Sequence, residues 1–556
     1  MKSNSLRILF YSLWSVVSVI QAVFTDLLPD EAYYWKYQTQ LAWGYFDHPP
    51  MIAWLIKPGY WLFGNELGIR LLIILLTLIL IYLLERLIKP NNLTLFYILI
   101  SSVAIFHFIG FLALPDLPLL FFTATFFIAY KLYLVNDNFK NSALLALAIA
   151  LLLYSKYHGI LVVFFTVLSN IKLLKKRSFW VVTAISLLLY LPHILWQYQH
   201  DWVSLRFHLV ERRYNDYLPI YTLEYLFSQP LISGPLVGIP LIWFFIKSSA
   251  KDNFNRALKF TGTGFYIFFF ISSFKGHVEA NWTFPALIPL LILGYGGIEK
   301  SGKTTRFIVR SFPITLILIF ILRIYLIHDF LPKGWIAASE VGGQHWRAWA
   351  KDIKTHVGNK IVVFANSYQR ASIYEYYSGD PSFSINNVWG RNNQFSVWDI
   401  TKNNCWENEV ALAHGFPVLK DDSVLTEIET VYFNYQHRFI ILPFIKIIPD
   451  QDSYEVKPGE ELVINFTILK KDHENIMIDA LQVKPNITYE IYAHDYLMKS
   501  TSTNQKLTDK LIKTGNGKIS FRAPEKPDTY YFSISIQTGV NPPTINSYKY
   551  KLVVEQ

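Results

Sequence analysis

Cysteine is almost absent from this chain of 556 residues. Its single thiol, Cys405, can form no intrachain disulfide and lies in no CxxC motif, so we expect it to be passive. Charged residues are also scarce, at 17%, whereas hydrophobic residues reach 52% and the mean hydropathy is +0.26. This composition excludes an ordinary soluble protein and is typical of a membrane protein with several spans. No basic stripe is interleaved with aromatic residues, so we expect no nucleic-acid partner.

Long apolar runs fill the first 330 residues and end there. A bilayer core of about 30 Å needs roughly 20 apolar residues in a helix. Residues 1–24 have the basic lead and apolar core of a signal peptide, but no small-residue cleavage site follows, so we predict that they remain as the first span. We predict eleven spans, near residues 6–24, 67–88, 93–114, 117–135, 140–155, 157–171, 178–198, 227–247, 257–274, 283–298 and 307–328.

Basic residues indicate the orientation of these spans. With eleven spans, the flanking clusters of Lys and Arg all fall on one side of the membrane, and they account for the net charge of +10. The positive-inside rule places that side in the cytoplasm. We therefore expect a multi-pass protein of the cytoplasmic membrane, with its N-terminus inside and its C-terminal part outside. The clusters are Lys2 and Arg7, Arg86 and Lys89, Lys131 and Lys140, Lys172 to Arg177, Lys247 to Arg256, and Lys300 to Arg306.

The apolar stretch 140–171 does not fit one simple span. One helix of this length would be about 48 Å long, whereas two helices would each reach about 23 Å. Two short spans that share a turn at 155–159, below the outer membrane surface, resolve this problem. Lys156 would then lie in a recessed place, where an ionisable residue indicates function. The alternative is a lysine that extends to the outer headgroups.

The composition changes after residue 330. Residues 331–556 are polar, rich in Asn and free of long apolar runs, so we predict an extracytoplasmic portion with two domains. In residues 331–445, a buried strand at 360–365 followed by a helix at 368–377 indicates an α/β domain. In residues 446–556, short strands separated by turn residues indicate a β-sandwich. These strands are predicted at 461–469, 476–483, 488–494, 518–522, 530–537 and 548–554.

Residues that can carry chemistry gather in the loops on the outer side. The loop after span one carries Asp30, Glu31, Asp47 and His48, and span four begins with Pro115-Asp116. The cytoplasmic loops carry no comparable clusters of acidic and aromatic residues. We therefore predict a site that faces outward and is built from several loops. The later outer loops contribute Lys156 and Tyr157, Arg212 and Arg213, and Lys275, His277, Glu279, Asn281 and Trp282.

The order of these motifs resembles a known group of enzymes. The chain is similar to the membrane-embedded glycosyltransferases of the GT-C fold in three motifs that follow one another. They are Asp30-Glu31 just after the first span, then Tyr45-Phe46-Asp47-His48-Pro49-Pro50, and then Pro115-Asp116. Within this group the chain resembles family 39, of the dolichyl-phosphate-mannose protein mannosyltransferase superfamily. It also resembles the bacterial lipid A aminoarabinose transferases and their galactosamine-adding relatives. The resemblance covers residues 6–330.

The resemblance implies an inverting transfer of a hexose or pentose from a polyprenyl-phosphate carrier on the outer face of the membrane. Lipid A, a surface glycan or a protein is the implied acceptor. Asp30 is implied as the catalytic carboxylate that orients the acceptor and takes its proton. Glu31 is implied to orient the loop or the sugar, and the alternative is a solvated partner for a loop lysine. Asp116 is the second catalytic acid, and the alternative is that it only favours the dipole of its helix.

Cations and aromatic residues of the outer loops are the implied substrate ligands. The leaving group is a lipid phosphate, whose developing charge is stabilised by cations, and Arg suits bidentate contacts. Aromatic faces stack on sugars, although Trp and Tyr are equally expected at a membrane interface. The periodicity from Tyr34 to Leu41 predicts a short helix along the membrane surface. The predicted substrate ligands are Tyr33, His48, Lys156, Tyr157, Arg212, Arg213, Lys275, Asn281 and Trp282.

A divalent metal ion is the one cofactor that the resemblance implies, and no nucleotide cofactor is expected. Asp47 stands where the family has an acidic ligand, and His277 is the matching histidine from a later outer loop. One carboxylate and one imidazole would need water to complete the ligand set. The family more commonly has Glu-Lys where this chain has Asp47-His48, which weakens the metal and lipid-phosphate assignments. The alternative for His277 is an interfacial histidine bonded to the backbone.

Two other classes of protein share some of these features. A transporter or flippase of lipid-linked sugars also has many spans and cavity charges, but it usually shows internal inverted repeats, which this sequence lacks. A non-catalytic membrane protein that binds glycans through its C-terminal sandwich is the second alternative.

Overall fold

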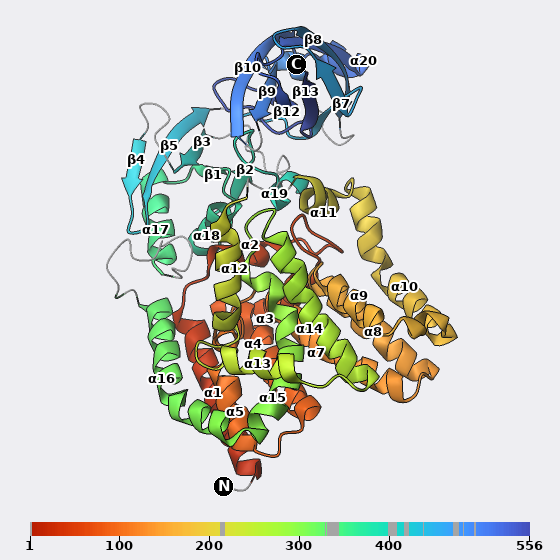
Figure 1. Ribbon diagram of the computed structural model, residues 1–556. Helices are drawn as coiled ribbons and strands as arrows, with labels where there is room; N and C mark the ends of the chain where they lie inside the picture. The colour runs from red at the N-terminus through yellow and green to blue at the C-terminus, as the bar shows by residue number, and fades with distance from the viewer. Residues whose placement is uncertain are drawn as a thin grey trace. The chain divides into compact units, whose positions relative to one another are not determined.

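The computed structural model of the chain describes residues 3–211, 217–328, 330, 344–398, 409–415, 422–437, 439–470, 477–481, 483–493 and 496–555. The chain divides into two compact units. The first comprises Met1–Arg206 and Asp216–Trp346, whose helices run from red to green in Figure 1. The second comprises Phe207–Asn215 and Arg347–Gln556 and holds every strand of the described residues. The division predicted at residue 445 stays a prediction.

Apolar helices dominate the first unit, because long runs without charge can satisfy their backbone groups in a membrane only as helices. Among the described residues, six helices are long and apolar enough to span, which confirms a polytopic helical membrane protein, while the count of eleven stays a prediction. They are α1 (Ser3–Phe24), α4 (Glu66–Ile88), α7 (Asp116–Val135), α10 (Arg177–Gln199), the turn η3 (Ala280–Ala286) with α15 (Leu287–Lys300), and α16 (Gly302–Ile327). Other helical segments of this unit are α5 (Leu93–Ser102), α8 (Phe139–Ser155), α9 (Gly159–Ser169), η1 (Ile171–Lys175), α11 (Val203–Arg206), α13 (Gly238–Lys247) and α14 (Asn253–Ser272), while η2 (Phe207–Glu211) belongs to the second unit.

Two predicted spans are broken into shorter helices. The segment 93–114 forms α5 and α6 (Ala104–Phe108), because Val103 adopts an extended conformation between them. The segment 227–247 is divided between α12 (Pro219–Ile232) and α13. Gly234 lies at that break with φ +124°, and a Cβ there would lie 2.6 Å from the carbonyl oxygen of Ser102. Only glycine fits both the backbone conformation and this close approach.

Two short helices follow the first span and position the outer loop. The helix α2 (Pro29–Tyr37) begins with proline at its first position and buries most of its residues. It starts five residues before the predicted surface helix, and its aromatic side chains pack inside the protein. The helix α3 (Met51–Phe63), which the sequence patterns did not predict, packs against α4.

A mixed sheet with covering helices forms one part of the second unit. Its strand order is β2-β1-β3-β5-β4, in which β1 pairs in parallel with β2 and β3. The predicted strand and helix at 360–377 are confirmed as β1 and α18. The elements are α17 (Trp346–Val357), β1 (Ile361–Ala365), α18 (Tyr368–Ser378), β2 (Ser382–Ile385), α19 (Gln394–Val397), β3 (Glu409–His414), β4 (Asp422–Leu425) and β5 (Thr430–His437).

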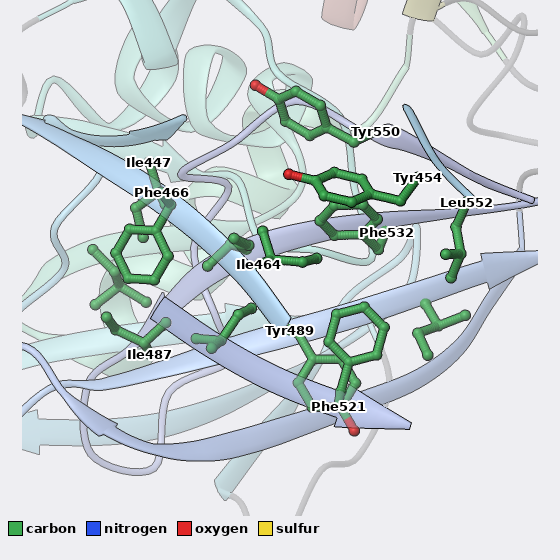
Figure 2. Close-up of a cluster of buried hydrophobic side chains, with 14 of the residues drawn as sticks. Ile447, Tyr454, Ile464, Phe466, Ile487, Tyr489, Phe521, Phe532, Tyr550 and Leu552 are labelled. Carbon is green, nitrogen blue, oxygen red and sulfur yellow. The ribbon is translucent and has the colours of Figure 1, made fainter. Parts of the chain in front are cut away.

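A β-sandwich forms the other part, as predicted. The sheet β10-β9-β12-β13-β7 packs on the sheet β11-β8-β6 through one apolar core, in which the rings of Tyr489 and Phe521 stack 4.5 Å apart (Figure 2). The elements are β6 (Ile445–Pro449), β7 (Ser453–Val456), β8 (Glu461–Lys470), η5 (Ile478–Ala480), β9 (Asn486–Ala493), β10 (Tyr496–Lys506), α20 (Asp509–Thr514), β11 (Asn516–Arg522), β12 (Asp528–Gln537) and β13 (Tyr550–Val554). The strand predicted at 476–483 is wrong. Residues 478–480 form a turn instead, because the Asp509 carboxylate accepts the amides of Ile478 and Asp479.

One buried acid lies on the side of β9 opposite this core. Glu490 is fully buried, and its carboxylate accepts hydrogen bonds from the hydroxyls of Thr488, Ser533 and Ser535 at 2.8, 3.0 and 2.6 Å. Burial raises the pKa of Glu490, and these hydroxyls oppose the rise.

Candidate active site

The acidic pair Asp30-Glu31 lies in the first turn of α2, and its two carboxylates have different surroundings. Glu31 is fully buried and forms a two-pronged ion pair with Arg70 of α4, at 2.9 Å from Nε and 2.5 Å from Nη2. Its oxygens also accept the backbone amides of Leu28 at 3.0 Å and Ala113 at 2.8 Å. The alternative of a solvated partner for a loop lysine is therefore wrong, and the role of Glu31 in orienting the loop or the sugar stays a prediction. Asp30 is only half-buried.

The Glu31–Arg70 pair connects several segments of the first unit. The Arg70 guanidinium also donates to the carbonyl oxygens of Ala22 and Thr25, at 3.0 and 2.7 Å, at the end of α1. Since Ala113 lies three residues before Asp116, the same pair fixes the entry to α7 beside the start of α2. A buried ion pair with this many hydrogen bonds holds its elements in one arrangement.

A second cluster joins three of the predicted residues from three separate turns. The Lys156 ammonium, at the end of α8, lies 2.8 Å from Oδ1 of Asp116 in the first turn of α7. The side-chain amide of Asn281, in η3, donates to the other Asp116 oxygen at 3.3 Å. Lys156 is buried, so the alternative of a lysine extended to the headgroups is wrong. Asp116 contacts both of these side chains, so it does more than favour a helix dipole.

Two polar groups of this cluster have hydrogen-bonding capacity to spare. An ammonium has three donors, and Asp116 is the one acceptor that the described residues provide for Lys156. The Asn281 Oδ1 atom is buried without a partner among the described residues. Buried polar atoms in proteins are nearly always hydrogen-bonded, so this cluster can take a further polar partner.

Tyrosines surround Asp47 in the loop that follows α2. The Tyr33 hydroxyl donates to Oδ2 of Asp47 at 2.6 Å, and the Tyr37 hydroxyl lies at 3.4 Å from the same atom. Burial raises the pKa of Tyr37 well above its ordinary value, so this phenol stays neutral and can donate. The Tyr37 ring stacks on Tyr45 at 4.0 Å, which holds the two parts of the loop together. Tyr33, predicted as a substrate ligand, thus contacts Asp47, and His48 is half-buried with its ring 5.6 Å from Tyr34.

Tyr157 joins its turn to α10 and to the same loop. Its hydroxyl lies 3.3 Å from Nε2 of His193 and accepts the side-chain amide of Gln197 at 2.9 Å. Gln197 also donates to Ser204, whose hydroxyl reaches the Tyr45 carbonyl oxygen at 3.0 Å. His193 and Gln197 were not predicted, although two polar residues one turn apart in an apolar span are a signal that could have identified them.

For the remaining predicted residues, a role in substrate binding stays a prediction. Lys275 is exposed, and Trp282 packs its ring 5.7 Å from His158. The two arginines, Arg212 and Arg213, lie outside the described residues.

The predicted metal ligands have different neighbours. His277 lies 3.5 Å from Glu224 and 3.6 Å from Glu279, and Asp47 contacts tyrosine hydroxyls. Among the residues that the structure describes, no group of three or more His, Cys, Asp or Glu side chains is arranged to hold a metal ion. A water-completed site from Asp47 and His277 stays a prediction.

Comparison with known proteins supports the family resemblance of the chain. Residues 47–196, which carry Asp47, Asp116 and Lys156, match the family model described as dolichyl-phosphate-mannose-protein mannosyltransferase. The predicted resemblance is confirmed: the chain is a multi-pass membrane protein that is similar to glycosyltransferases of the GT-C fold.

Two individual proteins are similar over most of the chain. The lipid A galacturonosyltransferase RgtD of Rhizobium johnstonii is 25% identical over 416 residues, which are 69% of this chain and 84% of that protein. The crystal structure of ArnT from Cupriavidus metallidurans in the apo state shares the fold, with a TM-score of 0.57 and 14% identity. That match covers 78% of this chain and 98% of ArnT.

Proposed function

We propose that this protein transfers a sugar from a polyprenyl-phosphate carrier to lipid A on the outer face of the cytoplasmic membrane, with its C-terminal unit outside the cytoplasm. The observation that carries the proposal is the buried cluster of Asp116, Lys156 and Asn281, which has spare donors and a spare acceptor for a polar ligand. The lipid A acceptor is supported by the similarity to RgtD, whose name states that it acts on lipid A. Galacturonic acid, the sugar in that name, is the first donor sugar to test.

The proposed reaction is a single displacement with inversion at the anomeric carbon. The acceptor oxygen forms the new bond to that carbon, while the bond to the carrier phosphate breaks and the phosphate oxygen takes the electron pair. When the acceptor is a hydroxyl, Asp30 takes its proton. When the acceptor is a phosphate on lipid A, no proton needs to be removed, and Asp30 orients the acceptor.

The buried ammonium of Lys156 is assigned to the leaving phosphate. Asp116 holds this side chain by one of its three donors, which leaves the other two for phosphate oxygens. In a site that excludes water, such preorganised donors stabilise developing negative charge strongly. The Asn281 carbonyl oxygen is assigned to a sugar hydroxyl, which needs an acceptor of this kind.

The test compares lipid A from cells with and without the protein by mass spectrometry. We expect the deletion to remove one sugar mass from lipid A, and the wild-type protein to restore it. Asp30→Asn and Lys156→Met are expected not to restore it. The control is Asp137→Asn with Lys176→Met, since this ion pair has the same residue types at 2.9 Å but is exposed. Unchanged lipid A in the deletion strain would refute the acceptor, and unchanged transfer by both site variants would refute the site.

A transporter would give a different result in the same experiment. Purified transferase with donor and acceptor on the same side of one membrane forms product, whereas a transporter moves the lipid-linked sugar and forms none. Product formation in detergent, where no compartment exists, therefore distinguishes the two classes.

A further inference from the structure

An apolar groove of about 380 Å³ lies in the membrane-spanning unit, between α1, α5 and α16. These helices pack together, α16 against both α5 and α1 (Figure 1). The groove lining includes Leu9 and Leu13 of α1 and Leu316 and Phe320 of α16. Its volume falls in the range of about 300–1,000 Å³ that is usual for ligand sites.

One charged side chain lines this groove. Arg323 of α16 is 3% exposed, and its Nε atom is buried with no hydrogen-bond partner among the described residues. Its one side-chain acceptor in that part of the chain is Oε1 of Gln21, at 3.5 Å. By contrast, Arg70 has the Glu31 carboxylate, although both guanidiniums lie within 5.6 Å of the Phe111 ring centre.

A buried cation without a counter-ion is costly in a membrane protein. Arg323 has no counter-ion among the residues that the structure describes, so it indicates an anionic partner. The position of Arg323 indicates where this partner lies. It precedes the end of α16 at Ile327 by four residues, or about 6 Å, and it contacts Gln21 near the end of α1. The cation thus marks the end of the groove nearest to a membrane surface, where lipid phosphates reside, and the apolar lining extends from it along the two helices.

We propose that this groove binds one acyl chain of an anionic glycerophospholipid, whose phosphate pairs with Arg323. The groove is open to the bilayer, because Leu13 and Phe320 of its lining are 56% and 46% exposed. It is separate from the candidate active site, because no residue of α7, α8 or η3 lines it. A phospholipid, which enters sideways from the bilayer, fits this position better than a sugar donor.

Phosphate bound at Arg323 also explains the neighbouring polar groups. The indole Nε1 of Trp14 is buried without a partner among the described residues, and its ring lies 4.6 Å from the His107 ring in the groove. The ester oxygens of a glycerolipid could accept a hydrogen bond from this indole N–H. The bound lipid would therefore join α1, α5 and α16 as a structural component of the fold.

The test is native mass spectrometry of the full-length protein, released from nanodiscs of phosphatidylglycerol and phosphatidylcholine. We expect one phosphatidylglycerol on the wild type and on Arg323→Lys. Its occupancy should fall by about tenfold on Arg323→Gln, which removes a charge-assisted bond, and on Leu316→Trp, which fills the groove. The matched control is Ile317→Trp, which adds the same ring to the outer side of α16, where Ile317 is 59% exposed.

Several results would overturn the proposal. The first is that the wild type retains no phosphatidylglycerol, and the second is that Leu316→Trp and Ile317→Trp retain it equally. The third is that an equimolar polyprenyl phosphate displaces phosphatidylglycerol. The last result would assign the groove to the sugar carrier instead. If Arg323→Gln does not fold, the two tryptophan variants still decide the question, because neither removes a charge.

Discussion

The buried pair of Asp116 and Lys156 allows a structural role to be separated from a catalytic one. Their charged atoms are 2.8 Å apart, and their side chains are only 5% and 6% exposed. Removing one partner of such a pair leaves a buried charge without compensation, which costs about 3–5 kcal/mol of stability. Lys156→Met and Asp116→Asn should each destabilise the protein by this amount. The double variant, with neither charge, should recover most of the loss.

Activity should follow a different pattern. If Lys156 stabilises the charge on the leaving phosphate, its loss should slow transfer by about 10²–10³-fold, the usual effect of removing one such donor. The double variant should then be as inactive as Lys156→Met, although it is more stable. The assay measures initial rates of transfer and thermal unfolding on the same purified proteins in detergent.

The exposed pair Asp137 and Lys176 serves as the reference for this cycle. Its members are 41% and 46% exposed, so their removal should change stability by no more than about 1 kcal/mol and leave transfer unchanged. The catalytic role would be refuted if the double variant of Asp116 and Lys156 recovered transfer together with its stability. The pair would then have a purely structural role.

Further predictions concern positions outside this pair. Glu31→Gln leaves its buried arginine partner without a counter-charge and should cost about 3–5 kcal/mol, seen as a lower melting temperature. Gly44→Ala would place a Cβ 2.4 Å from the Trp196 ring and should cost about 1–3 kcal/mol, whereas Gly296→Ala, with nothing within 4 Å, should be neutral. Because burial raises the pKa of Glu490 above its ordinary 4.5, the folded protein keeps a proton that the unfolded chain releases, so stability falls as pH rises above that value. Glu490→Gln should remove this slope, and its melting temperature relative to wild type should rise from about pH 5 to about pH 8; a constant difference would contradict the assignment.

The helical part of the fold could be predicted because apolar runs, and the polar residues that separate them, are local features of the sequence. Most predicted spans coincide with helices within a few residues. The breaks at Val103 and Gly234 were missed. The glycine at position 234 is required by its close approach to Ser102, which lies far away in the sequence. In the sandwich, β10 was missed because its sequence is polar and it pairs along one edge only, so it shows no apolar alternation.

The candidate site was predicted in part. Lys156, Asp116 and Asn281 meet, as expected of residues whose turns lie on one side of the membrane. Their individual contacts could not be predicted, because they depend on how three helices pack. Arg70 was missed as the partner of Glu31, although an arginine inside an apolar span is itself a signal of a buried contact.

The Glu31–Arg70 pair also bears on how the protein is made. The acid enters the membrane region with α1 and α2, and the arginine follows near the start of α4. Until the two meet, each charge must be hydrated or held at the headgroups, which delays the packing of either segment. Because Arg70 also bonds to the end of α1, the packing of α1 and α2 can be completed only after α4 has been inserted into the bilayer.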